Sequence, residues 1–329
     1  MTVVRPAADA SRRRGTNPSP NAPLSSNRQV RNYRVTESIL AGMFAGKVQD
    51  AEHEVSMQFS KFATAALLAM VMGGATISSA SAAQCGKTSA GFSDWIQDFK
   101  QEAAAQGVSA RLLDQVFATV SYNTNTIRAD RGQKSFKLSF DQFMKKRGGA
   151  VIISRGKAMK KSNASLFARI ESRYGVPAGP LIAIWGMETG FGGYMGNEHT
   201  LSAVATLAYD CRRTDYFTDQ LYAALQLVGS KSLALTARGA AHGEIGQTQF
   251  LPRNVVRFGA DGDGDGRVDL VHSRADALAS TANFLRGHGW QAGAGYQPGE
   301  SNFAALQGWN AASVYQQAIA YIGAQIDGQ

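Results

Sequence analysis

The chain has 329 residues, of which 44% are hydrophobic and 18% are charged. This composition supports a folded core and excludes disorder along the whole length. The length corresponds to about two domains, or to one large domain with tails. The two cysteines are too few for a disulfide-dense scaffold, a zinc ribbon or an iron–sulfur ferredoxin. The net charge of +9 favours an anionic partner such as a nucleic acid, an anionic lipid surface or an acidic polymer.

The N-terminal quarter combines a polar tail with a segment typical of export. Residues 1–56 are rich in Arg, Ser, Pro and Asn and show no periodicity, which predicts a disordered extension or a start of translation at Met57. Residues 57–83 join Lys61, an uncharged stretch over 62–77 and small residues of the A-x-A type, which predicts a signal peptide. An uncleaved anchor is the alternative, but the apolar stretch is shorter than the ~20 residues of a membrane span.

After export and cleavage, residues 84–329 are expected to form the mature protein in the periplasm, and they are the predicted catalytic region. An uncleaved signal would keep this region close to the membrane. Residues 1–83 hold nine Lys/Arg and five Asp/Glu, so the remaining chain has a net charge of +5. We therefore expect no nucleic-acid partner, because no stripe of basic residues interleaved with aromatics is left. In an oxidising compartment Cys85 and Cys211 either form a disulfide, which we favour, or stay as two thiols.

The exported region is predicted to be mainly helical. Apolar residues recur there with the 3.6-residue period of a helix, and Ser, Asn, Pro and Gly mark the expected ends. The strongest of the few strand signals is 150–153, and the chain has no internal repeat, P-loop or dinucleotide fingerprint. In chain order, the expected helices run from Ser93 to Gly107, from the cap Ser109 onward, from Ser165 to Gly175, from Pro177 to Glu188, over 217–228, from the capping box Ser273/Asp276 to Phe284, and from the cap Asn310 to Ile322.

The predicted helix from Pro177 carries a carboxylate on its apolar face. Leu181, Ile184, Trp185 and Glu188 fall at positions i, i+3, i+4 and i+7. Burial and the negative end of the helix dipole both raise the pKa of a carboxyl group there, which suits a general acid at neutral pH. Glycines follow closely, giving a loop that can approach a bulky ligand. The alternative is a glutamate at the helix edge that reaches water or pairs with an arginine.

Three motifs then follow one another at ordered separations. Residues 186–192, GMETGFG, match the pattern G-x-E-S/T-x-F/W-G, and residues 239–252, GAAHGEIGQTQFLP, end in G-Q-x-Q-F-x-P. Between them, residues 211–217, CRRTDYF, contain R-R-x-x-Y-F. Together these motifs resemble the signatures of lytic murein transglycosylases, and the third resembles the membrane-bound type B branch. The similarity runs from about Phe92 to Ile326.

The resemblance implies a mainly α, lysozyme-like catalytic domain of the goose-type/transglycosylase kind, with a small accessory region. It implies a carbon–oxygen lyase that cuts the β-1,4 bond between N-acetylmuramic acid and N-acetylglucosamine in peptidoglycan. One glutamate protonates the leaving oxygen and then takes the proton of the muramic acid C6 hydroxyl, which closes a 1,6-anhydro ring. No organic cofactor is implied. Most glycosidases need a second carboxylate, whereas an intramolecular nucleophile removes that need.

By position, the resemblance makes Glu188 the acid/base. Trp309 departs from the relatives, which often carry tyrosine there. Without the resemblance, Arg212 and Arg213 would be interpreted as a solvated pair on a loop, and Asn310 as a plain helix cap. The residues that the resemblance places along the glycan, its peptide or the catalytic carboxylate are Gln249, Asn310, Arg212, Arg213 and Tyr216.

Glu244, within the second signature, is a further candidate site residue, at a position that is small in some relatives. A second carboxylate supports an alternative function, a hydrolytic muramidase that uses water. In the non-hydrolytic reaction, Glu244 would only support Glu188. A non-catalytic protein that binds the wall or calcium is an alternative from another class.

Residues 261–269, DGDGDGRVD, fit the first nine positions of an EF-hand loop, with alternate oxygen ligands and a glycine at the sharp turn. Position 12 is His272, a poor ligand for a hard cation, and the resemblance assigns its role to an aspartate four residues later. The sequence therefore predicts a structural Ca²⁺, with an exposed Asp/Gly-rich turn as the alternative. The expected ligands are Asp261, Asp263, Asp265, Arg267 (by its backbone carbonyl) and Asp276.

Overall fold

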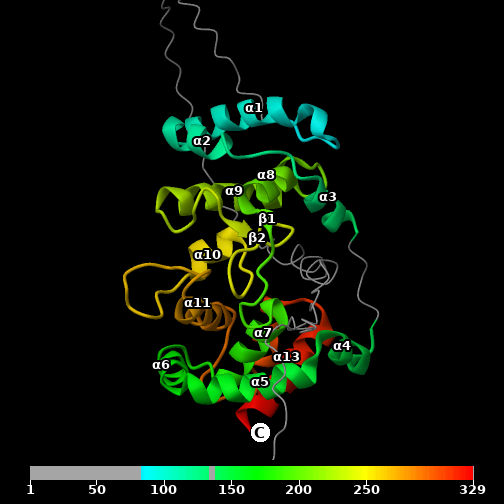
Figure 1. The fold of residues 1–329 in the computed structure, drawn as a ribbon, viewed down its shortest axis with the longest axis vertical. Helices are drawn as coiled ribbons and strands as arrows, with labels where there is room; N and C mark the ends of the chain where they lie inside the picture. The colour runs from blue at the N-terminus through cyan, green and yellow to red at the C-terminus, as the bar shows by residue number, and fades with distance from the viewer. Residues whose placement is uncertain (1–82, 133–137, 329) are drawn as a thin grey trace, which may run out of the picture. The chain divides into compact units, whose positions relative to one another are not determined.

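The computed structural model describes residues 83–132 and 138–328 (Figure 1). The predicted extension over 1–56 and the predicted signal peptide, apart from its last residue, lie outside the described residues. The chain divides into two units, 1–34 and 35–329, and every described residue belongs to the second. No helix within the described part of the chain is long and apolar enough to cross a membrane.

The described region is mainly helical, as predicted, and a short antiparallel pair of strands is the one sheet within it. In chain order the elements are η2 (Ser89–Gly91), α1 (Phe92–Ala105), α2 (Ala110–Phe117), α3 (Thr124–Arg131), α4 (Phe140–Arg147), α5 (Gly149–Ser162), α6 (Ala164–Tyr174), α7 (Ala178–Thr189), β1 (Glu198–His199), α8 (Thr200–Tyr209), α9 (Thr214–Gly229), β2 (Arg238–Gly239), α10 (Pro252–Phe258), α11 (Arg274–Gly287), α12 (Phe303–Trp309) and α13 (Ser313–Asp327).

Helix α7 lies at the centre of one helical layer. It packs against α13 and α5 (Figure 1), and all twelve of its residues are buried. Two glycines permit this close packing. A β-carbon at Gly179 would lie 2.3 Å from the carbonyl oxygen of Gly323, and one at Gly186 would lie 2.5 Å from the Ile152 side chain. The sequence predicted one apolar face for this helix, whereas the structure buries it on every side, as expected for a helix in the core of a large domain.

Helix α7 begins and ends within one residue of the predicted bounds, Pro177 and Glu188. Pro177 is the N-cap, and Gly190 ends the helix with a φ of 60°, in the left-handed region that glycine adopts readily. Glu188 therefore sits in the last turn.

Helices α8 and α9 pack against each other and form a second layer, to which α1 and α2 add. Cys85 and Cys211 form a disulfide that ties the start of the described region to the turn between α8 and α9. Backbone hydrogen bonds between Gly86 and Tyr209 (2.9 Å) and between Cys211 and Gly86 (3.3 Å) support the same junction. A disulfide that closes a loop of 126 residues lowers the conformational entropy of the unfolded chain. In the loop-closure model this stabilises the folded state by about 5 kcal/mol.

Some predicted local features were wrong. The predicted strand over 150–153 belongs to α5, because Ile152 packs against α7 as part of a 14-residue helix. Helix α1 begins one residue before Ser93, with Gly91 as its N-cap. Ser165 likewise lies inside α6. A serine near a helix start has a capping role only where the backbone turns, as it does at Ser109, whose side chain accepts from the Leu112 amide at 3.3 Å.

The prediction that Asn310 caps the last helix was also wrong, because the N-cap of α13 is Ala312. Asn310 follows the last residue of α12, and α13 begins only at Ser313. The predicted capping box before α11 is half formed: Ser273 Oγ accepts from the Asp276 amide at 3.2 Å. The Asp276 carboxylate instead accepts from the amides of Gly262 and Asp269, both at 2.8 Å.

Candidate active site

Glu188 is buried, and its two carboxyl oxygens have different surroundings. Oε1 accepts hydrogen bonds from the Tyr315 hydroxyl at 2.7 Å and from Trp309 Nε1 at 3.0 Å. Oε2 is buried with no hydrogen-bond partner among the described residues. The partners come from the end of α12 and the first turn of α13, so three helices build the site.

Burial raises the pKa of Glu188 to about 7, although the Trp309 and Tyr315 hydrogen bonds and the Arg147 charge act to lower it. A carboxyl group with this pKa carries a proton on about half of the molecules at neutral pH. Both neighbours of Oε1 are donors, so Oε1 is an acceptor and the acid proton belongs on Oε2. Burial also raises the pKa of Tyr315 well above its usual value, which keeps it a donor.

Glu244 is equally buried but has the opposite character. Oε2 accepts from the His242 amide at 2.9 Å, and Oε1 lies 3.1 Å from His242 Nδ1. Burial acts to raise the pKa of Glu244, but the His242 imidazole and the backbone hydrogen bonds outweigh it and lower the pKa. The Glu244 charge in turn contributes to the raised pKa of Glu188. The site thus holds a protonatable carboxyl group that senses the charge of an ionised one, a pairing typical of acid–base sites.

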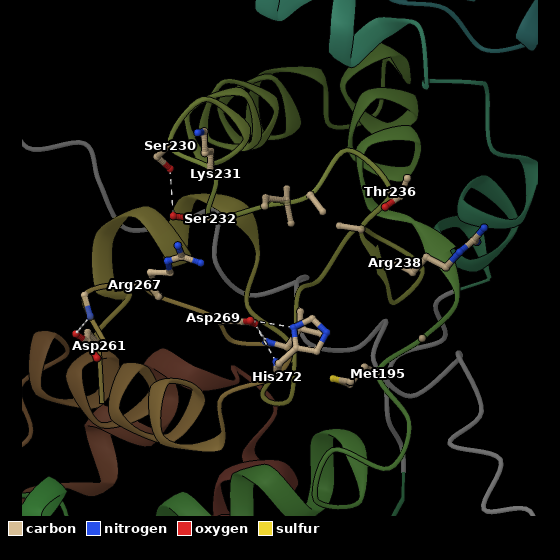
Figure 2. A pocket seen from close by; sticks show the side chains of 17 residues that line it. Met195, Ser230, Lys231, Ser232, Thr236, Arg238, Asp261, Arg267, Asp269 and His272 are labelled. Carbon is tan, nitrogen blue, oxygen red and sulfur yellow. Dashed lines mark hydrogen bonds and ion pairs between the residues drawn. The ribbon is translucent and has the colours of Figure 1, made fainter. Parts of the chain in front are cut away.

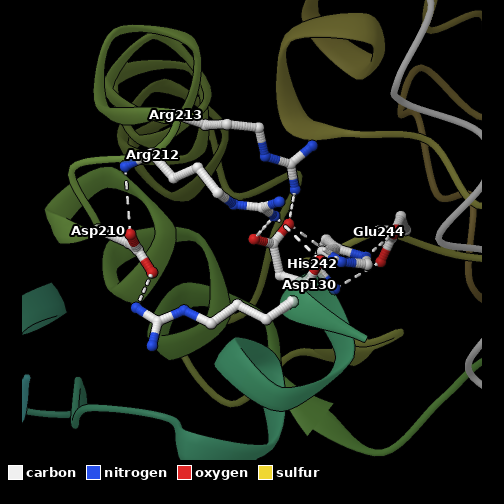
Figure 3. A network of polar contacts seen from close by, with 7 residues as sticks. Asp130, Asp210, Arg212, Arg213, His242 and Glu244 are labelled. Carbon is white, nitrogen blue, oxygen red and sulfur yellow. Dashed lines mark hydrogen bonds and ion pairs between the residues drawn. The ribbon is translucent and has the colours of Figure 1, made fainter. Parts of the chain in front are cut away.

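The two predicted arginines belong to the charged network behind Glu244 (Figure 3). Arg212 and Arg213 both form ion pairs with the buried Asp130, and His242 Nε2 lies 3.7 Å from the same carboxylate. Asp130 lies in the last turn of α3, and no sequence motif had pointed to it. The Arg212 side chain is about half exposed (47%), so it can still reach a ligand.

Three further residues were predicted for the site: Tyr216, Gln249 and Asn310. Tyr216 is partly buried, which raises its pKa to about 12. Gln249 has a φ of 59°, and its Nε2 donates to the Gly246 carbonyl at 2.8 Å, so the side chain holds a left-handed turn. Asn310 is buried and contacts the backbone: its Oδ1 accepts from the Ala312 amide at 2.9 Å. Asn310 thus fixes the turn that joins the helices of Trp309 and Tyr315.

The first and second signatures lie side by side. Thr189 Oγ1 donates to the Gln247 carbonyl at 2.6 Å and accepts from the Gly192 amide at 2.9 Å. A β-carbon at Gly192 would lie 2.9 Å from Gln247 Oε1, so this glycine is needed for the close approach. The residue after the buried acid is therefore fixed to the second signature.

The acidic loop brings together three of the residues that the sequence predicted as ligands. Asp261, Asp263 and Asp276 can each place a carboxylate oxygen within 4.8 Å of the others. The side chain of Asp265 instead accepts from the Arg267 amide at 2.8 Å. His272, at position 12, pairs with Asp269 at 2.9 Å. Three carboxylates with no nitrogen or sulfur donor among them fit a hard cation such as Ca²⁺.

Comparisons with known proteins agree with this geometry. The family model described as the transglycosylase SLT domain matches residues 91–298. The membrane-bound lytic murein transglycosylase B of Escherichia coli K12 is 35% identical over 122 residues, which are 36% of this chain and 34% of that protein. The match therefore spans about a third of that relative's length.

Solved structures give the fold. SltB3 from Pseudomonas aeruginosa, in complex with NAG-anhNAM-pentapeptide, is 28% identical with a TM-score of 0.67, over 72% of this chain and 80% of that one. The Escherichia coli lytic transglycosylase Slt35 in complex with calcium is 21% identical with a TM-score of 0.63, over 74% and 96%. Both have the fold described above.

Proposed function

The chain belongs to the transglycosylase SLT domain family, and we propose that it cleaves the β-1,4 bond between N-acetylmuramic acid and N-acetylglucosamine in peptidoglycan. The fold is lysozyme-like, as expected. The observation that carries the proposal is the buried Glu188, with a pKa of about 7 and a second carboxyl oxygen without a described partner. The bound fragment of SltB3, NAG-anhNAM-pentapeptide, supports 1,6-anhydromuramic ends as the product.

In the first step, protonated Oε2 of Glu188 gives its proton to the glycosidic oxygen. The bond from that oxygen to the muramic acid C1 breaks, and positive charge develops at C1. The carboxylate formed on Glu188 keeps the hydrogen bonds from Tyr315 and Trp309, which stabilise its negative charge. The ionised Glu244 adds a negative charge that favours the positive C1 centre.

In the second step, Glu188 acts as a base. It takes the proton of the muramic acid C6 hydroxyl while O6 bonds to C1 and closes the 1,6-anhydro ring. The proton returns to Glu188, so the cycle neither consumes water nor changes the protonation of the enzyme. A pKa near 7 suits both directions of transfer, because the same group must release and regain a proton at neutral pH.

Hydrolysis is the competing chemistry, and it needs a second carboxylate as nucleophile or as base for water. Glu244 is the candidate for that role. Both of its oxygens are engaged by His242, one with the amide and one with the ring. This occupation favours the non-hydrolytic reaction, with Glu244 as an electrostatic neighbour of Glu188.

We further propose that Asp261, Asp263 and Asp276 bind a structural Ca²⁺. Their oxygens converge, and the Slt35 structure was solved in complex with calcium. Asp265 and the Arg267 carbonyl remain ligands expected from the sequence. A bound ion would neutralise the clustered carboxylates and tie the loop to the first turn of α11. That helix also carries Phe284, whose ring packs 5.1 Å from Trp309, so the ion would support the wall of the site.

We propose a periplasmic location, either released or held at the membrane by residues 57–83. The relative from Escherichia coli is named a membrane-bound enzyme, and the disulfide suits an oxidising compartment. N-terminal sequencing of the protein recovered from cell fractions tests this: a start near residue 84 means cleavage, and an intact segment in the membrane fraction means an anchor.

Mass spectrometry of the products tests the reaction. The full-length protein is incubated with purified peptidoglycan, and the muropeptides are analysed without chemical reduction. Anhydromuramic ends are expected, lighter by one water than reducing muramic ends. Reducing ends would assign hydrolysis and give Glu244 a direct role, and the absence of products with calcium present would favour a binding protein.

A further inference from the structure

The His242 imidazole is fully buried and lies between two carboxylates (Figure 3). Nδ1 lies 3.1 Å from Oε1 of Glu244, and Nε2 lies 3.7 Å from Oδ1 of Asp130. Both carboxylates are buried as well. Neither His242 nor Glu244 lines the pocket between residues 230–238 and 261–272 (Figure 2). The surroundings of the ring therefore indicate a role inside the protein, toward the two acidic groups.

A tight turn folds the Glu244 side chain back onto His242. The Gly243 amide donates to the Ala240 carbonyl at 3.0 Å, and the Ala240 amide donates to the Glu244 carbonyl at 3.2 Å. Gly243 has a φ of 86°, and a β-carbon there would lie 2.4 Å from the Val204 side chain, so the turn packs directly on α8. Both carboxyl oxygens of Glu244 consequently meet the same residue, Oε2 at the His242 amide and Oε1 at the His242 ring.

The opposite nitrogen of the His242 ring faces a carboxylate that is itself held in place. Asp130 forms an ion pair with Arg212 through one oxygen and with Arg213 through the other. The Arg212 guanidinium also donates to the backbone carbonyl of Asp130 at 3.0 Å. Because the partner of one ring nitrogen decides which way an imidazole presents the other, this cluster fixes the orientation in which Nδ1 meets Glu244.

The charge of this cluster acts on the catalytic acid through Glu244. A buried carboxyl group without a partner takes up a proton, because burial disfavours its charged form. At Glu244 the His242 imidazole and the backbone hydrogen bonds outweigh burial and lower the pKa, so this carboxylate stays ionised. Its charge raises the pKa of Glu188, whereas the charge of Arg147 lowers it. The other titratable groups that act on these two carboxyl groups are Tyr315, Arg213 and Tyr216.

We propose that His242 is a positioning residue of the reaction, which orients the Glu244 carboxylate and keeps its negative charge available to Glu188. This inference deepens the proposed function and rests on it for the effect on catalysis. Without His242, Oε1 of Glu244 would be buried without its ring donor, and the carboxyl group would take up a proton. Glu188 would then lose a charge that helps it to keep its own proton at neutral pH.

An NMR titration of the two buried glutamates tests the proposal without a substrate. The full-length protein is isotopically labelled at the glutamate Cδ, and Glu188→Gln and Glu244→Gln assign the two signals. In His242→Gln we expect the Glu244 signal to titrate at higher pH than in wild type and the Glu188 signal at lower pH. The control is His272→Gln, which changes an exposed histidine and should titrate as wild type does. An unchanged titration of Glu244 in His242→Gln overturns the proposal.

A double-mutant cycle on the rate of product formation tests whether His242 acts through Glu244. His242→Gln alone should move the alkaline limb of the pH–rate profile to lower pH and lower the maximal rate by about tenfold or less. Added to Glu244→Gln, it should cause no further shift, because the carboxylate that it positions is already gone. A full additional shift in the double variant, or an unchanged profile in His242→Gln, is the result that contradicts the positioning role.

The two experiments separate this inference from the proposed function. If the unmodified protein forms no anhydromuramic products, the proposed function fails, while the NMR titration still decides whether His242 keeps Glu244 ionised. If His242→Gln does not fold, His242→Asn replaces it in both experiments. Asparagine keeps a donor near the Nδ1 position without the imidazole charge, so smaller shifts in the same directions are expected. The absence of any shift in His242→Asn then overturns the proposal.

Discussion

The Tyr315 hydroxyl donates a 2.7 Å hydrogen bond to Oε1 of Glu188 across 127 residues of sequence. This contact joins the first turn of the last helix to the last turn of the central one. It fixes which carboxyl oxygen accepts and which carries the proton. The orientation of the catalytic acid is therefore decided by the packing of α13 against α7.

Replacing the acid tests its role directly. Glu188→Gln keeps the shape of the side chain and removes the titrating proton, so we expect the rate of anhydromuramic product formation to fall at least about 100-fold. The matched control is Glu171→Gln, on the exposed side of α6, which should retain full activity. Retained activity in Glu188→Gln would remove Glu188 from the mechanism.

The stability difference between wild type and Glu188→Gln should depend on pH. Burial raises the pKa of Glu188 from 4.5 to about 7, so the unfolded chain releases this proton first. The free energy of unfolding should therefore fall as pH rises from about 4 to about 7 and then stay level. Glu188→Gln lacks this titration, so relative to wild type it should gain up to about 3 kcal/mol between pH 4 and pH 8. Denaturant unfolding at the two pH values measures the gain, and a constant difference would contradict the raised pKa.

Tyr315→Phe removes one donor from the Glu188 carboxylate and keeps the ring. Because this hydrogen bond lowers the pKa of Glu188, the pKa should rise and the alkaline limb of the pH–rate profile should move to higher pH. We expect the maximal rate to fall about tenfold, since the carboxylate between the two steps loses support. Tyr321→Phe, on an exposed position of α13, is the control and should leave the profile unchanged.

Glu244→Gln should move the same limb in the opposite direction. The charge of Glu244 helps to raise the pKa of Glu188, so its removal lowers that pKa and shifts the alkaline limb to lower pH. In the non-hydrolytic mechanism we expect a loss of activity of about tenfold or less, whereas a general base for water would give at least about 100-fold. The pH–rate profile and the product masses together decide between these roles.

Calcium removal should lower thermal stability. At a free Ca²⁺ concentration of about 100 times Kd, a bound ion adds about 2.7 kcal/mol, so chelation should lower Tm by several degrees. Asp276→Asn should abolish this calcium-dependent shift. Asp141→Asn, in the exposed first turn of α4, should keep it. Identical melting curves with and without calcium would contradict the calcium site.

Local sequence signals located the catalytic helix well. Pro177 favours a helix start because its φ is fixed, and Gly190 favours a helix end because glycine tolerates a positive φ. In the structure these two residues flank α7. Serine caps were less reliable: Ser109 caps α2, but Ser93 lies inside α1. The difference arises because a cap depends on where the backbone turns, which tertiary contacts decide.

The site itself could be predicted only in part. Trp309 stands out in the sequence only as a departure from the relatives, and Tyr315 only as one residue of the predicted last helix. Both are partners of Glu188. Asp130 carried no signal, because a single aspartate near a helix end is ordinary until two arginines and a histidine converge on it.

The sequence by itself determined the mainly helical architecture, the position of one carboxylate at the end of an apolar helix, and the acidic loop with its glycines. These depend on periodicity and on backbone preferences within a few residues. Only the tertiary structure decided how that carboxylate is buried, which donors hold Oε1, why Glu244 stays ionised, and which three aspartates converge. Those properties arise from groups more than 100 residues apart or from competing hydrogen bonds, and the packed core selects among them.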